Sequence, residues 1–231
     1  MKPKYLIFAL VTFALLSYGL YQALVVAPTE RTMGDVQRIF YYHLPSAMIA
    51  FTLFLVNFLA SIWYLARRTL KADAVAVATA EVGVVFCTVV LVTGPLWARP
   101  VWGIWWTWDA RLTSTLVLWL VYVSYLTLRR FSAGSQTPVI AAALAVFGFV
   151  DVPFVYMSNR IFRTQHPQPV IGGGEGSGLD PSMWPPVLWN LLAFAAFALM
   201  LVMLRYYLER MRHKLADEMT MPAAAAAKVG R

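Results

Sequence analysis

The stretch AVAVATAEVGVVFCTVVLVTGPL, residues 74–96, decides the fold class. Glu81 is its only charged side chain. A helix needs about 20 predominantly apolar residues to cross the hydrocarbon core of a bilayer, so this stretch is long enough to span a membrane. The composition agrees, because 60% of the 231 residues are hydrophobic and only 13% are charged.

Five other apolar blocks accompany this stretch, and together they predict an all-α polytopic membrane protein, a bundle of six transmembrane helices. The six blocks are residues 5–27, 44–66, 74–96, 112–128, 139–157 and 184–208. The fourth block is only marginally long enough for a span. The first block follows Lys2 and Lys4 as a signal peptide would, but its apolar run exceeds the roughly 7–15 residues of such signals. We therefore expect the first block to be retained as a span.

Lysine and arginine are unevenly distributed between the two sides of the predicted bundle. Of the 19 such residues, 13 fall at the termini and in the second and fourth loops, and six fall in the other three loops. Cytoplasmic loops carry the excess of positive charge, so we expect both termini to be cytoplasmic. This predicts a membrane domain over residues 1–208 and a basic, Ala-rich cytoplasmic tail over residues 209–231. The chain has no nucleic-acid-binding pattern of interleaved basic and aromatic residues.

The opposite, outer face gathers tryptophans and two histidines. The third loop, about residues 97–112, carries most of WGIWWTWDARLTS, residues 102–114. The flanking outer loops, about residues 28–43 and 158–183, carry His43 and His166. Imidazoles ligate haem iron, aromatic rings cover the porphyrin, and cations meet its propionates, so the pattern favours a haem site. Arginines on this face that could meet the propionates are Arg38, Arg99, Arg111, Arg160 and Arg163.

An ordinary membrane-surface interpretation of the same residues stays open. Tryptophans commonly form a belt where a helix leaves the bilayer. A single histidine at a helix boundary is more often a cap or a loop residue than a metal ligand. The density of tryptophan between two histidine-bearing loops is what favours the haem site over this alternative.

The tryptophan-rich stretch strongly resembles the WWD signature of the haem-handling proteins of cytochrome c maturation. RIFYYHLPSA, residues 38–47, looks like the first histidine block of one branch, the haem exporter protein C (CcmC) family. The resemblance implies that haem b is held without a covalent bond and that His43 and His166 are the axial ligands of its iron. Arg111 is the first candidate for a propionate contact. The haem-binding residues that it implies are His43, His166, Trp102, Trp105, Trp106, Trp108, Asp109 and Arg111.

The same resemblance implies a location and partners. The chain would be a multi-pass protein of the bacterial inner membrane that passes haem to a periplasmic haem chaperone. The other implied partners are an ABC-type ATPase with its membrane subunit, a small single-span adaptor protein, and membrane lipid. Family members often have Glu where this chain has Thr115, and we expect this difference to affect a contact at the partner or lipid face.

Cysteine and glycine usage narrows the chemistry. Cys87 is the only cysteine, so there is no C-x-x-C-H site for covalent haem attachment. The glycines of VIGGGEGSGLDPSM, residues 170–183, do not fit a nucleotide-binding pattern, and either a solvated loop or a hinge for His166 stays open. No nucleophile or acid–base pair stands out. We therefore expect no catalytic centre, with lyase-like assistance to haem attachment on a partner left open.

Two other classes of protein compete with haem handling. A quinol-oxidising cytochrome b subunit predicts histidines at mid-membrane on facing helices, and the predicted spans contain none of this kind. A transporter with Glu81 and Asp151 as coupling acids predicts repeated halves with discontinuous helices. For these two acids, a hydrogen bond to a neighbouring helix and a role in steering haem or protons both stay open. Asp151 precedes Pro153, which should bend the fifth span.

Overall fold

The computed structural model describes residues 3–132, 134–170 and 178–229, and its regular secondary structure is helical. Six helical stretches are long and apolar enough to cross a membrane, which confirms the predicted bundle of six spans. The elements are α1 (Pro3–Tyr21), η1 (Gln22–Val26), η2 (Asp35–Ile39), α2 (Phe40–Arg67), α3 (Leu70–Trp102), α4 (Ala110–Phe131), α5 (Thr137–Phe149), α6 (Asp151–Ile161), η3 (Pro181–Met183) and α7 (Trp184–Val229).

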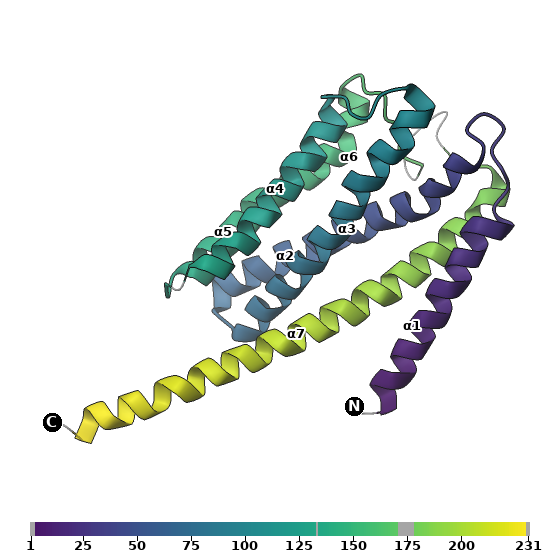
Figure 1. Cartoon of the computed structure of the whole chain (residues 1–231). Helices are drawn as coiled ribbons and strands as arrows, with labels where there is room; N and C mark the ends of the chain where they lie inside the picture. Colours follow the sequence, from purple (N-terminus) through teal and green to yellow (C-terminus); the bar gives the residue numbers. More distant parts are fainter. Residues whose placement is uncertain (1–2, 133, 171–177, 230–231) are drawn as a thin grey trace.

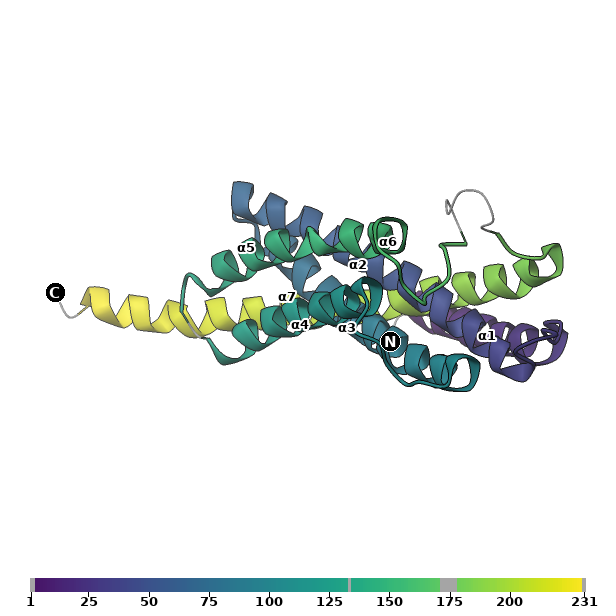
Figure 2. The same ribbon diagram turned by 90° about the horizontal axis from the view of Figure 1, so that it is seen from above.

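The helices α2 and α3 form an antiparallel pair at the centre of the bundle (Figure 1). Arg68 ends α2 in the left-handed conformation, and the side chain of Thr69 caps α3 by accepting a hydrogen bond from the N–H of Ala72. The helices α4, α5 and α6 pack beside this pair, while α7 packs against both of its members and carries α1 (Figure 2). The other spans are therefore arranged around the α2–α3 pair.

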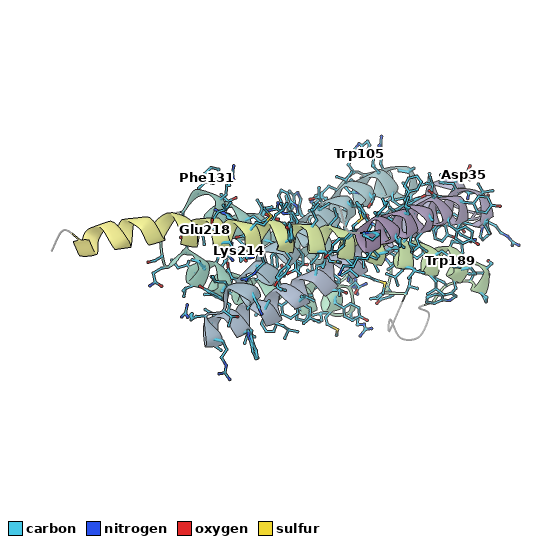
Figure 3. All side chains as sticks on the ribbon, turned by 90° about the horizontal axis from the view of Figure 1, so that it is seen from below. Asp35, Trp105, Phe131, Trp189, Lys214 and Glu218 are labelled. Carbon is cyan, nitrogen blue, oxygen red and sulfur yellow. The ribbon has the colours of Figure 1, made fainter. Side chains whose placement is uncertain are left out.

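Alternation of the spans brings distant segments of the chain to the same end. The segments before α2, between α3 and α4, and after α6 meet at one end, and both termini lie toward the other (Figure 1). Figure 3 marks the two ends by side chain, with Asp35, Trp105 and Trp189 toward one and Phe131 and Lys214 toward the other. The histidine loops and the tryptophan loop thus share one end, as the parity of six spans predicts.

A close approach of three helices forms the middle of the core. The ring of Phe54 on α2 stacks on the ring of Tyr122 on α4, with centroids 3.8 Å apart and planes 14° from parallel. Gly83 on α3 lies against this stack, and a Cβ atom there would stand only 2.7 Å from the Phe54 ring. Glycine is needed at this position because any side chain would force the helices apart.

Ion pairs join the helices toward the end that holds the termini. Arg129 on α4 donates two hydrogen bonds of 2.7 Å to the carboxylate of Asp73 on α3. His213 on α7 places Nε2 3.4 Å from both Asp73 and Glu209. These largely buried ionisable side chains therefore connect α3, α4 and α7.

The two intramembrane acids have different environments. Glu81 forms an ion pair with Arg205 on α7. Of the two roles considered for this acid, the structure therefore shows the contact with a neighbouring helix. Oδ2 of Asp151 is buried without a hydrogen-bond partner among the described residues. The helix breaks at Val150, between α5 and α6, because Pro153 has no N–H to donate to the carbonyl of Phe149. The structure thus shows an interruption of the fifth span next to Pro153, and the bend itself stays a prediction.

Several boundaries differ from those predicted by hydropathy. Residues 97–102 belong to α3 rather than to the third outer loop, and residues 40–43 belong to α2 rather than to the first. The helix α7 continues without a break past residue 208 as far as Val229. Hydropathy shows only where the chain is apolar. A helix can continue past the apolar block, because its backbone hydrogen bonds do not require apolar side chains. The Gly-rich stretch predicted as a loop or hinge falls largely on residues 171–177, outside the described residues.

Candidate functional site

His43 and His166 face one another at the end of the bundle where the tryptophan loop lies. His43 is in the first turn of α2, and His166 is in the segment that follows α6. Their ring centroids are 6.4 Å apart and their planes are tilted by 37°. Two residues 123 positions apart in the sequence therefore form a pair.

The ring of His43 is held by α3. Its Nδ1 lies 2.8 Å from the hydroxyl oxygen of Thr93. Trp97, one turn further along α3, meets the imidazole edge-on with centroids 6.1 Å apart. A helix places residues four positions apart on one face, so Thr93 and Trp97 act on the histidine together.

His166 is held by its own loop and by the end of α6. Its Nδ1 donates to the carbonyl oxygen of Pro167 at 2.8 Å, which fixes the ring proton on Nδ1 because a carbonyl can only accept. Asn159 on α6 donates to the same carbonyl at 2.9 Å and accepts at its own carbonyl from Gln168 at 3.0 Å. Burial, followed by the nearby Arg111 guanidinium, lowers the pKa of His166 to about 4. The imidazole is therefore neutral at physiological pH and its Nε2 is available as a ligand.

A small, mostly apolar pocket of about 80 Å³ lies beside the two imidazoles and is partly open to the surroundings. Both histidines line it, and it descends between α2 and α3 as far as Phe51 and Cys87. Ligand pockets typically have volumes of about 300–1,000 Å³, so the enclosed space here is smaller than such a pocket, and a ligand as large as haem would extend through its open side. The pocket therefore joins the histidine pair to an apolar interior.

The tryptophans divide into two groups. Trp102 and Trp106 line the pocket, and so does Trp97, which was not among the predicted site residues. Trp105 and Trp108 do not line it and are 56% and 77% exposed. The indole nitrogens of Trp97 and Trp106 are buried without a hydrogen-bond partner among the described residues, so each has an N–H group left to donate.

Asp109 and Arg111 shape the start of α4. Oδ1 of Asp109 accepts from the N–H of Leu112 at 3.0 Å, which caps the helix, and Oδ2 accepts from the hydroxyl of Thr107 at 3.0 Å. Nη1 of Arg111 donates to the carbonyl oxygens of Val155 at 2.8 Å and Tyr156 at 3.3 Å on α6. Arg111 also lines the pocket, so its remaining N–H groups are beside the ligand space.

Three of the other arginines on this face have local structural contacts. Arg38 donates to the carbonyls of Ala23 and Ala27 at 2.9 and 3.3 Å, and Arg99 donates to the carbonyl of Gly103. Arg160 lies over the ring of Tyr156. Among the described residues, none of these three lines the pocket, and neither does Arg163, which leaves Arg111 as the arginine at the ligand space.

Thr115 lies inside the bundle rather than on its surface. It is 8% exposed, lines the pocket, and donates to the carbonyl of Arg111 at 2.8 Å. The expectation of a partner or lipid contact at this position is therefore wrong. Sequence reasoning missed Trp97 as a lining residue because it placed Trp97 in the outer loop, although the residue belongs to α3. It missed Thr115 because the apolar pattern did not show which face of α4 points inward.

The donor set fits haem. Metal–imidazole bonds of about 2.0–2.1 Å on the two sides of one iron, lengthened by half of each ring, separate the ring centroids by roughly 6 Å. The observed separation is 6.4 Å. Apolar walls suit the porphyrin, and Arg111 with the unpartnered indole N–H groups suits its propionates.

Known proteins resemble the chain along nearly all of its length. A family model described as Heme exporter protein C (CcmC) matches residues 2–221. The chain is 34% identical to Heme exporter protein C of Bradyrhizobium diazoefficiens over 220 residues, which are 95% of this chain and 83% of that protein. It is 30% identical to Heme exporter protein C of Escherichia coli K12 over 203 residues, 85% and 80% of the two chains. A putative cytochrome c biosynthesis ccmC-like mitochondrial protein of Marchantia polymorpha is 31% identical over 183 residues, 79% and 76% of the two chains. The chain therefore belongs to the Heme exporter protein C (CcmC) family of cytochrome c maturation.

Proposed function

We propose that this protein holds haem between His43 and His166 and passes it to a periplasmic haem chaperone during cytochrome c maturation. The family assigns the chain to haem handling in cytochrome c biogenesis. The observation that supports the more detailed proposal is the histidine pair. The ring centroids of the two histidines are 6.4 Å apart, and both rings line an apolar pocket. The membrane is the bacterial inner membrane, and the site faces its outer side.

The ligand geometry favours carriage over catalysis. If both imidazoles bind the iron, no coordination position would stay open for oxygen or another substrate. The haem would be held without a covalent bond, because Cys87 is the only cysteine and lies within α3. Handing on the haem requires the protein to release at least one axial ligand. His166, which is on a loop rather than in a helix, is the ligand better able to move.

The exposed tryptophans supply a second part of the proposal. Trp105 and Trp108 do not line the pocket, although Trp108 packs edge-on against Trp106 and lines a shallow hollow beside it. Both are exposed, and large exposed aromatic side chains are typical of protein interfaces. We assign them to contact with the chaperone. The ABC-type ATPase, its membrane subunit and the single-span adaptor are partners proposed from family membership alone.

Visible spectroscopy of the purified protein tests the haem ligands. We expect the wild type to show a low-spin bis-histidine spectrum, and His43→Ala and His166→Ala each to become high-spin or lose haem. Trp106→Ala should lower the haem content, whereas Trp105→Ala, the matched exposed control, should keep haem and lose transfer to the chaperone. Wild-type protein without haem, or a spectrum indifferent to both histidines, would overturn the proposal.

The same experiment addresses the quinol-oxidising alternative. That class needs haem at mid-membrane, but the three histidines of this chain lie near the ends of the spans or in a loop. If a haem spectrum survives the double change His43→Ala/His166→Ala and the iron is reduced by quinol, the electron-transfer function is favoured instead.

A further inference from the structure

The imidazole of His43 is fastened to α3 by one side-chain hydrogen bond. Its Nδ1 lies 2.8 Å from Oγ1 of Thr93, across the interface between α2 and α3. The next residue, Gly94, lies beside the Cε1 edge of the ring, where a Cβ atom would make ordinary van der Waals contact at 3.7 Å. Trp97 covers the ring from the following turn. Among the described residues, Thr93 supplies the polar contact that orients this imidazole.

The direction of this hydrogen bond follows from a second contact of the same hydroxyl. Oγ1 of Thr93 lies 2.6 Å from the carbonyl oxygen of Val89, one turn back along α3. Two oxygens approach this closely when a hydrogen lies between them. A hydroxyl has one hydrogen to donate, so Oγ1 accepts from His43. The ring proton of His43 is therefore on Nδ1.

We infer that Thr93 is a positioning residue that holds His43 as the Nδ1–H tautomer and leaves Nε2 free to bind iron; this inference rests on the proposed function. The hydrogen bond at one ring nitrogen determines which nitrogen binds a metal. Such a partner also fixes the ring orientation and makes the ligand more basic, which is typically worth about 10–100-fold in metal affinity. The Pro167 carbonyl holds His166 in the same Nδ1–H tautomer, so Nε2 is the nitrogen left free on both histidines.

A purely structural role is the competing explanation. Threonines inside helices often bond to the carbonyl four residues back without any further function. Thr79, about four turns earlier on α3, does this with the carbonyl of Val75 at 2.8 Å and is buried. Thr79 contacts no histidine among the described residues, so it provides a matched control on the same helix.

Three variants separate the two roles. Thr93→Val keeps the shape of the side chain and removes the hydroxyl, whereas Thr93→Ser restores the hydroxyl. Thr79→Val removes an equivalent helix contact away from the site. Each full-length protein is purified and titrated with haem, and the haem-free protein is labelled with nitrogen-15 histidine. The His43 signals, identified by their loss in His43→Gln, report which ring nitrogen is protonated.

We expect Thr93→Val to bind haem about tenfold more weakly or worse and to lose the uniform Nδ1–H signature of His43. Thr93→Ser and Thr79→Val should stay close to the wild type in both measurements. The inference is overturned if Thr93→Val keeps the wild-type affinity and tautomer, or if Thr79→Val causes an equal loss. Wild-type protein that binds no haem would refute the proposed function instead, and the tautomer in the haem-free protein would still decide the role of Thr93.

Discussion

At the scale of single residues, Asp109 is both a predicted haem contact and the observed cap of α4. Its Oδ1 accepts from the N–H of Leu112, and it does not line the pocket. We expect Asp109→Ala to lower stability by about 0.5–2 kcal/mol, the usual cost of losing a cap, and to lower haem content through displacement of Arg111. Asp109→Asn keeps an oxygen acceptor and should stay near the wild type.

Thermal unfolding and the ratio of haem to protein measure both effects. Asp35→Ala is a suitable control because the Asp35 side chain is exposed on the same end of the molecule. If Asp109→Asn is as damaging as Asp109→Ala, the negative charge matters to the ligand and the capping explanation fails.

His166 provides a prediction about pH. Burial and Arg111 lower its pKa from 6.5 to about 4, so the folded protein binds this proton less readily than the unfolded chain. The ring should stay neutral and able to ligate above about pH 4, and should lose its free nitrogen as the pH falls through that value. The stability of the folded state should likewise decline as the pH falls from about 6.5 to about 4, and this residue should add no pH dependence above 6.5.

Nitrogen-15 histidine spectra of the haem-free protein over this pH range test the prediction, with His166 identified by its loss in His166→Gln. A midpoint near 6.5 would contradict it, because that value belongs to an imidazole surrounded by water.

The residues of the site differ in how far the sequence predicts them. The parity of six spans predicts that His43 and His166 share a face, and the structure pairs them. Parity cannot distinguish Trp106, which enters the pocket, from Trp105, which does not, because side-chain directions in an irregular loop follow no period. Thr93 is four residues before Trp97, which would place the two on one face of a helix. The sequence indicates this only if α3 is known to continue as far as Trp97.

At the scale of elements, the contact between Asp73 and Arg129 holds α3 to α4. The two side chains are 4% and 12% exposed and share two hydrogen bonds. Arg129→Met would leave the buried carboxylate without its guanidinium, which typically costs about 3–5 kcal/mol. Replacing both partners, as Asp73→Leu/Arg129→Met, should be less damaging than the single change.

Thermal unfolding in detergent measures this difference. Arg212→Met is the control, because Arg212 is 67% exposed and its contact with Glu209 is long, at 3.8 Å. Glu209 is buried but keeps its contact with His213, so losing the long contact to an exposed arginine should cost only about 0–1 kcal/mol. The prediction is wrong if Arg129→Met unfolds at the same temperature as Arg212→Met.

The number of spans was predictable, whereas their ends were not. Apolar length predicts six helices, and Pro153 predicts the break in the fifth. Pro95 and Pro100 look like helix terminators in sequence, yet α3 continues through both as far as Trp102. Prolines are tolerated inside membrane-spanning helices because the packed surroundings can compensate for the lost hydrogen bond, and that packing is not visible in local sequence.

At the scale of the whole molecule, the two ends of the bundle have different chemistry. One end gathers the histidine pair, the pocket and the exposed tryptophans. The other holds the ion pairs around Asp73 and both termini. The helix α3 runs the full distance between them, beginning near Asp73 and ending beside the pocket at Trp102. If the protein transfers a ligand on one side of a membrane, the end that holds the histidine pair must face that side.

The orientation itself is the last prediction, and the excess of lysine and arginine at the termini places them in the cytoplasm. Cysteine accessibility tests it in a Cys87→Ser background. Thr32→Cys, in the loop before α2, should react with a membrane-impermeant maleimide in intact spheroplasts. Ser132→Cys, in the loop after α4, should react only after permeabilisation. Both positions are exposed, so the membrane alone separates them. The opposite pattern would put the histidine pair on the cytoplasmic side, where a periplasmic chaperone could not receive haem from it.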